Sequence, residues 1–123
     1  MTRCLLIAES AEERGDLLPI LKRLGLHCET REGTQEGIQF CHAEMPDVII
    51  MEASERPATR EFLKLVQRRG QGQAAPIVIL YTSTPNLQAM GASILEGAAE
   101  FLVKPFNDTL MRFKLELAGV ALH

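Results

Sequence analysis

The chain has 123 residues, of which 46% are hydrophobic and 24% are charged, and its formal net charge is -3. This length and composition are typical of one folded domain with its own core and exclude a disordered chain. Because 13 basic residues stand against 16 acidic ones and no long basic run occurs, the sequence argues against nucleic-acid binding. We therefore treat residues 1–123 as a single domain.

The amino terminus and the cysteines bear on the compartment of the protein. The apolar run after Arg3 is too short for a signal-peptide core or a membrane span. Cys4, Cys28 and Cys41 are odd in number, and their spacing matches neither a zinc motif nor a CxxC redox pair. We expect small buried hydrophobic side chains at these positions, a reducing cytoplasmic location and no membrane contact.

Five apolar runs predict five strands, at residues 3–8, 26–32, 47–51, 76–81 and 99–106. The first, third and fourth runs are nearly continuous, which is typical of strands that are covered on both faces. The second run alternates more between apolar and polar residues. It therefore predicts a strand closer to an edge of the sheet.

Helical patterns separate the strands, at residues 10–25, 33–45, 58–70, 86–97 and 107–122. In the first, Ser10 can cap the helix and Gly25 can end it. Pro19 removes one backbone hydrogen bond, so it predicts either a kink or a helix that begins only near Asp16. In the third, the apolar residues Phe62, Leu65 and Val66 share one side.

Strand and helix alternate five times, which indicates an α/β fold of (βα)5 type: a doubly wound, five-stranded parallel sheet with helices on both faces. In such sheets ligands and chemistry gather at the carboxyl ends of the strands. The residues just past four of the runs are Ala8, Glu9 and Ser10; Glu52, Ala53 and Ser54; Tyr81, Thr82 and Ser83; and Lys104, Pro105 and Phe106.

One motif close to the carboxyl terminus points to a family. "GAAEFLVKPF" (97–106), with the (βα)5 order, the run before Glu52 and "PIVILYT", resembles the receiver domain of bacterial two-component response regulators, the CheY-like superfamily. The resemblance covers nearly the whole chain and implies a flavodoxin-like sheet with strand order 2-1-3-4-5. It also implies a phosphorelay signalling module whose partner is a histidine kinase, an output domain or another signalling protein.

In that family the first strand ends in two carboxylates that help to hold Mg²⁺, and the third ends in an aspartate that accepts a phosphoryl group. The fourth strand ends in Ser or Thr, and the fifth carries a lysine. The matching positions here are Ala8 and Glu9; Glu52; Thr82 or, in a stricter register, Tyr81; and Lys104. The resemblance therefore implies a divergent receiver with Glu at the phosphoacceptor position.

These substitutions argue against efficient phosphorylation. Ala8 removes one oxygen ligand of Mg²⁺, and the extra methylene of Glu52 displaces its carboxylate by about 1 Å, which can lower a rate roughly a hundredfold. We therefore expect no enzyme activity, no catalytic residue, no metal site and at most weak binding of Mg²⁺. The expected degenerate pocket consists of Glu9, Glu52, Tyr81, Thr82 and Lys104.

The longer reach of Glu52 suggests a different role for it. We hypothesise an ion pair between Glu52 and Lys104, partly shielded from water, that holds the switch surface in one state without phosphate. An exposed pair contributes only about 0–1 kcal/mol, so it would bias an equilibrium rather than dictate it. A degenerate pocket without preference for either state is the other interpretation.

Phe101 stands where the family places a switch aromatic, although it can equally be a core residue. We expect the large Tyr81 side chain to fill the room into which Phe101 would swing, which would fix the surface in one state.

The last helical segment carries two apolar stripes: Leu110, Phe113, Leu117 and Val120; and Met111, Leu115, Ala118 and Leu122. Only one can face the sheet, and the sequence leaves open which one. The partner surface that we expect comprises Leu110, Phe113 and Leu117. The resemblance implies binding of a partner, or formation of a homodimer, through the fourth helix, fifth strand and fifth helix.

Three functions can be set against each other. The first is a non-enzymatic pseudo-receiver that acts by protein–protein interaction and is not switched by phosphate. The alternative is a working Mg²⁺-dependent receiver that a histidine kinase phosphorylates at Glu52 or at a nearby hydroxyl such as Ser54. The third, a small-ligand sensor at the strand ends, has support only from the fold. We favour the first because of Ala8 and Glu52.

Overall fold

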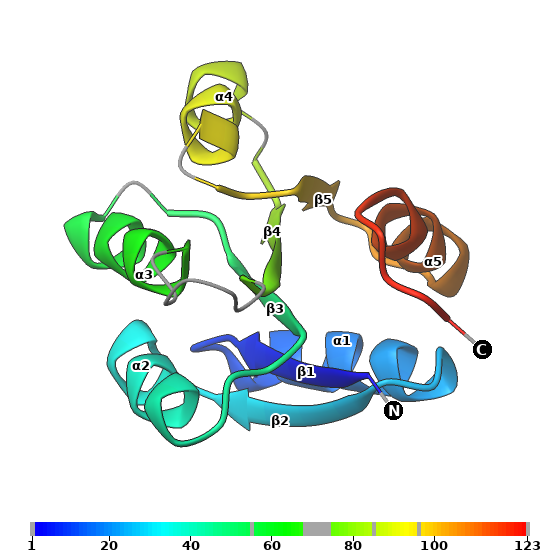
Figure 1. The fold of residues 1–123 in the computed structure, drawn as a ribbon. Helices are drawn as coiled ribbons and strands as arrows, with labels where there is room; N and C mark the ends of the chain where they lie inside the picture. The colour runs from blue at the N-terminus through cyan, green and yellow to red at the C-terminus, as the bar shows by residue number, and fades with distance from the viewer. Residues whose placement is uncertain (1, 55, 68–74, 85, 96, 123) are drawn as a thin grey trace.

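The computed structural model describes residues 2–54, 56–67, 75–84, 86–95 and 97–122. Strands and helices alternate along these residues (Figure 1). The elements are β1 (Arg3–Ile7), α1 (Ala11–Arg23), β2 (His27–Arg31), α2 (Thr34–Ala43), β3 (Val48–Glu52), α3 (Pro57–Gln67), β4 (Ile77–Thr82), α4 (Leu87–Leu95), β5 (Glu100–Val103) and α5 (Asp108–Leu117).

The five strands form one parallel sheet in the order β2-β1-β3-β4-β5. This order confirms the α/β class and the strand order that the sequence implied. Because all strands run in the same direction, the carboxyl ends of β1, β3 and β4 meet at one edge of the sheet. The register sets Glu52 opposite Tyr81 there.

Helices cover both faces of the sheet (Figure 1). On one face, α1 and α5 contribute Leu17, Leu21, Met111 and Leu115 to a core that also contains Tyr81. On the other face, α3 supplies most of the buried helical side chains, and residues of α2 and α4 pack against its margin. The alternation of side chains along each strand, with a period of two residues, divides the strand residues between the two cores.

α1 is longer than one of the two sequence interpretations allowed. It runs from Ala11 to Arg23 with Pro19 inside it, so the proposal that the helix begins only near Asp16 is wrong. The cap at Ser10 is confirmed, because its hydroxyl accepts a hydrogen bond from the backbone N–H of Glu13 at 3.2 Å. The ring of Pro19 is exposed to solvent, where it displaces no core side chain.

α5 ends earlier than the periodicity predicted. It stops at Leu117, and Gly119 adopts a φ of +99°, a left-handed conformation that favours glycine. Met111 and Leu115 face the sheet and are fully buried, which settles the choice between the two stripes. The chain turns back after Gly119, so Val120 is buried although it belonged to the other predicted stripe.

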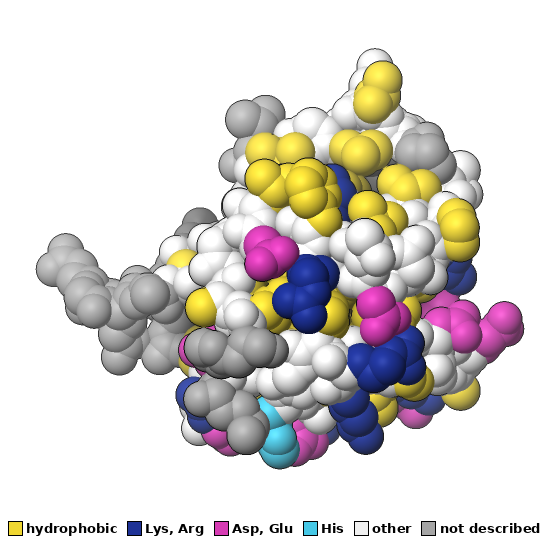
Figure 2. Space-filling model, turned by 90° about the vertical axis from the view of Figure 1, so that its right-hand side faces the viewer, with side chains coloured by type: hydrophobic (Ala, Val, Ile, Leu, Met, Phe, Trp, Pro, Cys, Tyr) yellow, Lys and Arg dark blue, Asp and Glu magenta, His cyan; other side chains and the backbone are white. Residues whose placement is uncertain are grey.

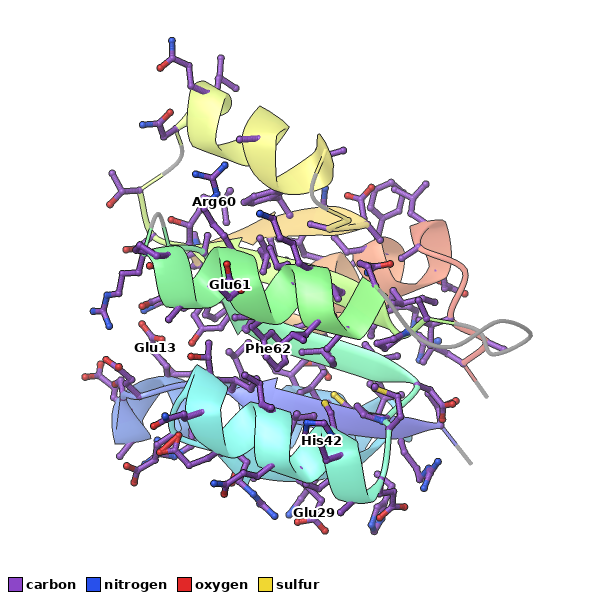
Figure 3. The ribbon with its side chains drawn as sticks, turned by 60° about the vertical axis from the view of Figure 1, so that its left-hand side comes forward. Glu13, Glu29, His42, Arg60, Glu61 and Phe62 are labelled. Atoms are coloured by element: carbon purple, nitrogen blue, oxygen red, sulfur yellow. The ribbon has the colours of Figure 1, made fainter. Side chains whose placement is uncertain are left out.

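α3 buries Phe62, Leu63 and Val66, whereas Leu65 is 48% exposed. The predicted apolar side of this helix was therefore wrong at one position. Figure 3 shows Phe62 pointing from α3 toward the sheet. The end of the predicted helix, at 68–70, lies outside the described residues.

The structure explains why the "GAAEFLVKPF" motif begins with glycine, at Gly97. Its φ is +113°, and a Cβ atom at this position would lie 2.6 Å from the side chain of Gln67. The carbonyl oxygen of Gly97 accepts a hydrogen bond from Nε2 of Gln67 at 3.2 Å. Both the backbone conformation and the close approach therefore require glycine before β5.

Candidate functional site

Three of the predicted site residues come together at the carboxyl edge of the sheet. Glu52 is the last residue of β3, Tyr81 lies opposite it on β4, and Lys104 follows β5. The Phe106 ring lies against two of them: its centroid is 5.6 Å from that of Tyr81 in an edge-to-face contact, and 5.7 Å from Nζ of Lys104. The "KPF" segment thus forms one wall of the site.

The centre of the site is occupied by Glu13, a residue of the first turn of α1. The Tyr81 hydroxyl donates a hydrogen bond to Oε2 of Glu13 at 2.6 Å, and Nζ of Lys104 donates to Oε1 at 3.2 Å. The Glu13 side chain is only 15% exposed and that of Lys104 is 33% exposed. Figure 3 labels Glu13 at the end of the sheet where β1 finishes and α1 begins. Both carboxylate oxygens are therefore held by residues of other elements.

The expected ion pair between Glu52 and Lys104 is wrong. The ion pair of Lys104 is formed with Glu13, from the helix, and not with the strand-end acid. The physical reason is position: the largely buried carboxylate of Glu13 lies within hydrogen-bonding distance of Tyr81 and Lys104, whereas the Glu52 residue is exposed. Lys104 acts on Glu52 only as a weaker electrostatic influence that lowers its pKa.

The two glutamates differ in their protonation behaviour. Burial alone would raise the pKa of Glu13, but the hydrogen bonds from Tyr81 and Lys104 outweigh it and lower the pKa. Partial burial, followed by the negative charge of Glu13, raises the pKa of Glu52. Burial and the hydrogen bond to Glu13 raise the pKa of Tyr81, so it remains a neutral donor. At neutral pH the site holds an ionised Glu13, stabilised by the hydrogen bonds from Tyr81 and Lys104, beside a Glu52 whose charge is disfavoured.

Glu9 does not join this cluster as a ligand. Its carboxylate is 68% exposed and lies 3.5 Å from a guanidinium nitrogen of Arg56, in the loop before α3. Glu9, Glu52, Ser54 and Arg56 line a shallow pocket of about 80 Å³. The guanidinium of Arg56 therefore places a positive charge of the protein itself in the pocket that Glu52 lines.

The residues at this edge do not fit Mg²⁺. This ion requires several oxygen ligands in near-octahedral geometry. Ala8 offers a methyl group that is buried, and Glu9 is paired with Arg56. Among the residues that the structure describes, no group of three acidic, histidine or cysteine side chains could hold a metal ion.

Arg14 holds the backbone of the turn between β1 and α1. Its guanidinium donates to the carbonyl oxygen of Ala8 and, at 3.1 Å, to that of Glu9. The turn between β1 and α1 is thus held by a side chain one residue after Glu13, which restrains the start of the helix from which Glu13 projects.

The two candidate hydroxyls lie in different surroundings. In the pairing of β3 with β4, Tyr81 and not Thr82 lies opposite Glu52. The Thr82 hydroxyl accepts from the N–H of Thr84 at 3.1 Å and lies 3.2 Å from its carbonyl oxygen, so it serves a local turn. Ser54 likewise accepts from the backbone N–H of Arg56 at 3.0 Å. These two hydroxyls stabilise loops at the rim of the site.

Phe101 is buried, but Tyr81 does not fill the space beside it. Phe101 is 6% exposed and packs in the core on the α3 side of the sheet. Tyr81 belongs to the core on the α1 and α5 side. The expectation that Tyr81 blocks Phe101 is wrong because Phe101 lies opposite Leu80 in the register of β4 and β5, and Tyr81, the residue after Leu80, points to the other face of the sheet. The position of Phe101 in this structure is inward.

The face formed by α4, β5 and α5 carries exposed apolar side chains. Leu87 and Ile94 of α4 are 85% and 54% exposed, and Phe113 and Leu117 of α5 are 56% and 58% exposed. Figure 2 views this side of the molecule and shows hydrophobic side chains gathered in its upper part. Leu110, the third residue of the expected partner surface, is half-buried against the core instead. Exposed apolar side chains therefore occur on α4 as well as on α5.

No helix in the described ranges combines the length and the apolar character that crossing a bilayer requires.

Comparison with solved structures places this architecture among receiver domains. The chemotaxis response regulator CheY4 of Vibrio cholerae is similar with a TM-score of 0.81 at 24% identity, over 96% of this chain and 98% of that one. A response regulator receiver protein from Burkholderia phymatum gives 0.78 at 20% identity, over 99% and 98%. A response regulator from Thermotoga maritima gives 0.81 at 16% identity, over 96% and 98%.

No family model matches the sequence, and no curated protein matches it. At these identities the structural likeness demonstrates a shared fold. The resemblance that the 97–106 motif indicated is therefore confirmed at the level of the receiver fold.

Glu13 is the site residue that sequence reasoning missed. The predicted site consisted of residues that follow strands, whereas Glu13 lies in a helix. One signal was present: Glu13 precedes the buried Leu17 by four positions and so shares its helix face. An acid at the head of a buried stripe requires partners, because an unpaired buried charge is costly.

Proposed function

We propose that the protein is a receiver-like signalling module of two-component type that works without phosphorylation, a pseudo-receiver. It has no enzymatic activity of its own and binds no Mg²⁺ as part of its function. The observation that carries this proposal is the Glu13 carboxylate, bound by Tyr81 and Lys104 at the edge where receivers place their phosphoryl chemistry.

The physical argument concerns charge and space. The lysine of a receiver is useful to a phosphoryl group only while it is available to bind the new negative charge. Here Lys104 already neutralises Glu13, and an incoming phosphoryl group would meet two carboxylates, Glu13 and Glu52. Two like charges beside a dianionic group are electrostatically unfavourable. In this proposal the carboxylate of Glu13 takes the place of the phosphoryl group as the partner of Lys104.

Signalling then depends on a protein partner. We assign that role to the apolar face of α4, β5 and α5, defined by Leu87, Ile94, Phe113 and Leu117. Its occupant is a histidine kinase, an output domain, another signalling protein or a second copy of this chain. The net charge of -3 supports a protein partner rather than a nucleic acid. A cytoplasmic location agrees with the thiol state of Cys4 and Cys28.

The proposal is tested by incubating the wild-type chain with acetyl phosphate and Mg²⁺ and measuring its intact mass. A variant that combines Ala8→Asp, Glu13→Ala and Glu52→Asp restores the acids of a working receiver and serves as the comparison. The wild type should gain no phosphoryl group. A stoichiometric adduct on wild-type Glu52 or Ser54 would establish the working receiver instead.

A pull-down tests the surface separately. Wild-type protein and the double variant Phe113→Ser, Leu117→Ser are used as baits on extract of the source cell. A partner that the wild type retains and the variant loses supports the assignment to this face. Equal retention by both would place the partner elsewhere.

A further inference from the structure

Cys4 and Cys28 form a pair of thiols that the proposed signalling function does not use. They lie directly opposite each other in the parallel register of β1 and β2. Both side chains belong to the core on the α1 and α5 side, so they point to the same face of the sheet. Neighbouring strands are about 4.8 Å apart, and a disulfide requires Cα atoms about 4.4–6.8 Å apart. The register therefore allows the two sulfur atoms to be joined.

The two thiols contact each other and are chemically different. A hydrogen bond between them, together with burial, raises the pKa of Cys4. The same hydrogen bond lowers the pKa of Cys28 against the opposing effect of burial, and the positive charge of Lys22 lowers it further. Because the thiolate is the nucleophilic form of cysteine, Cys28 is the thiol that attacks first.

Solvent exposure also indicates that Cys28 reacts before Cys4. Cys4 is 1% exposed in β1, whereas Cys28 is half-buried on β2, which is an edge strand of the described sheet. A groove of about 320 Å³ between α1 and β2 is lined by Arg14, Lys22 and Thr30, the last of which is two residues from Cys28 on the same strand and so on the same face of the sheet. The two basic side chains favour an anionic reagent.

We propose that Cys4 and Cys28 are a dithiol modification site that an anionic low-molecular-weight disulfide, such as glutathione disulfide, converts to an intramolecular disulfide. The Cys28 thiolate attacks one sulfur of the reagent, so that a mixed disulfide forms and one reagent thiolate leaves. The Cys4 sulfur then attacks the Cys28 sulfur, gives up its proton and displaces the second reagent thiol. The protein loses two hydrogens, and its two electrons reduce the reagent to two thiols.

Cys41 provides an internal control. It lies in α2 and packs against the core on the opposite face of the sheet. Cys41 does not lie in the paired strands that hold Cys4 and Cys28, and it does not line the groove of about 320 Å³. The proposed reaction should therefore spare it.

The test treats the folded chain with glutathione disulfide, alkylates the remaining thiols and digests the product with trypsin. The cysteines fall on three different peptides, 4–14, 24–31 and 32–60. The expected product is a disulfide-linked pair of 4–14 and 24–31 whose mass is two hydrogens below their sum, with Cys41 alkylated. The variant Cys41→Ser should give the same linked pair.

Two further variants make the order of attack testable. In Cys4→Ala the reaction should stop at a single glutathione adduct on Cys28. If this core substitution prevents folding, Cys28→Ser at the half-buried position replaces it, and Cys4 should then remain unmodified. A wild-type chain that stays unmodified, stops at the mixed disulfide or links Cys41 instead would overturn the proposal.

Discussion

Nζ of Lys104, at the end of β5, lies 3.2 Å from Oε1 of Glu13 in the first turn of α1. This ion pair joins the first helix to the last strand across the carboxyl edge of the sheet. A second bond, from the Tyr81 hydroxyl at 2.6 Å, completes the coordination of the same carboxylate. The site is therefore organised by a residue of α1 and not by the acid at the end of β3.

Glu13→Gln should destabilise the protein at neutral pH. The substitution removes the charge that Lys104 and Tyr81 bind, and hydrogen bonds to charged groups contribute about 1.5–3 kcal/mol each when they are fully buried. Because Lys104 is partly exposed, we expect a loss of about 1–2 kcal/mol. Urea unfolding at pH 7 measures it. Glu12→Gln, the exposed neighbour in the same helical turn, is the matched control and should change little.

The Glu13 contribution should also depend on pH with a defined sign. The pKa of folded Glu13 is lowered, so its stabilisation is complete above the ordinary pKa of glutamate and is lost as the pH falls through the folded pKa. The difference in unfolding free energy between wild type and Glu13→Gln should therefore shrink in acid. A difference that stays constant down to that range would show that Glu13 is not held as a carboxylate.

Tyr81→Phe should raise the pKa of Glu13. It removes one of the two donors while it keeps the ring that packs against Phe106. The lost hydrogen bond to a carboxylate should cost about 1 kcal/mol of unfolding free energy. A titration followed by the NMR signal of the Glu13 side-chain carbonyl measures the shift. An unchanged pKa in Tyr81→Phe would mean that the phenol does not stabilise the carboxylate.

Glu52→Gln should stabilise the protein slightly at neutral pH. The pKa of Glu52 is raised, so between its ordinary and its raised pKa the folded state holds more protons than the unfolded one, and stability falls as pH rises through that window. Removing the charge should recover a few tenths of a kcal/mol, because the residue is exposed. Urea unfolding of the wild type and of Glu52→Gln, at pH 7 and at a pH below the ordinary pKa of glutamate, measures this difference in unfolding free energy. Destabilisation at pH 7 would indicate that Glu52 carries a favourable pair after all.

The alternation of strands and helices and the identity of the site edge could be predicted from the sequence, whereas the strand order followed only from the resemblance of the 97–106 motif. Continuous apolar runs at β1, β3 and β4, and a polar residue after each, determine which ends of the strands carry chemistry. The contacts of Glu13 with Tyr81 and Lys104 could not be predicted, because they depend on how far a helical side chain reaches across the edge of the sheet. Periodicity places Glu13 on the buried face of α1, but only the packing of that helix shows that its carboxylate meets Tyr81 and Lys104.

The end of α5 shows the same limit. Its apolar residues recur on two stripes up to Leu122, so the pattern alone cannot tell a longer helix from one that stops. The left-handed Gly119 ends it and returns Val120 to the core. Glycine after a helix was a usable signal for this end.

Replacing a leucine by alanine should lower the stability of the protein more on one apolar stripe of α5 than on the other. Leu115→Ala removes a fully buried side chain and should cost about 2–5 kcal/mol. Leu117→Ala, at a position that is 58% exposed, should cost less than about 0.5 kcal/mol. The midpoint of urea unfolding compares the two variants directly. Similar losses for both would mean that Leu117 is covered in the folded protein.

Fluorine NMR of the chain with Mg²⁺ and beryllium fluoride, a mimic of the phosphoryl group, distinguishes an occupied site from an open one. Lys104 is engaged by Glu13, and the described residues offer no set of oxygen ligands for the metal, so the wild type should show only the resonances of the free reagent. The variant that combines Ala8→Asp, Glu13→Ala and Glu52→Asp should show bound resonances. A tight, stoichiometric complex with the wild type would contradict the proposal that Glu13 replaces the phosphoryl signal.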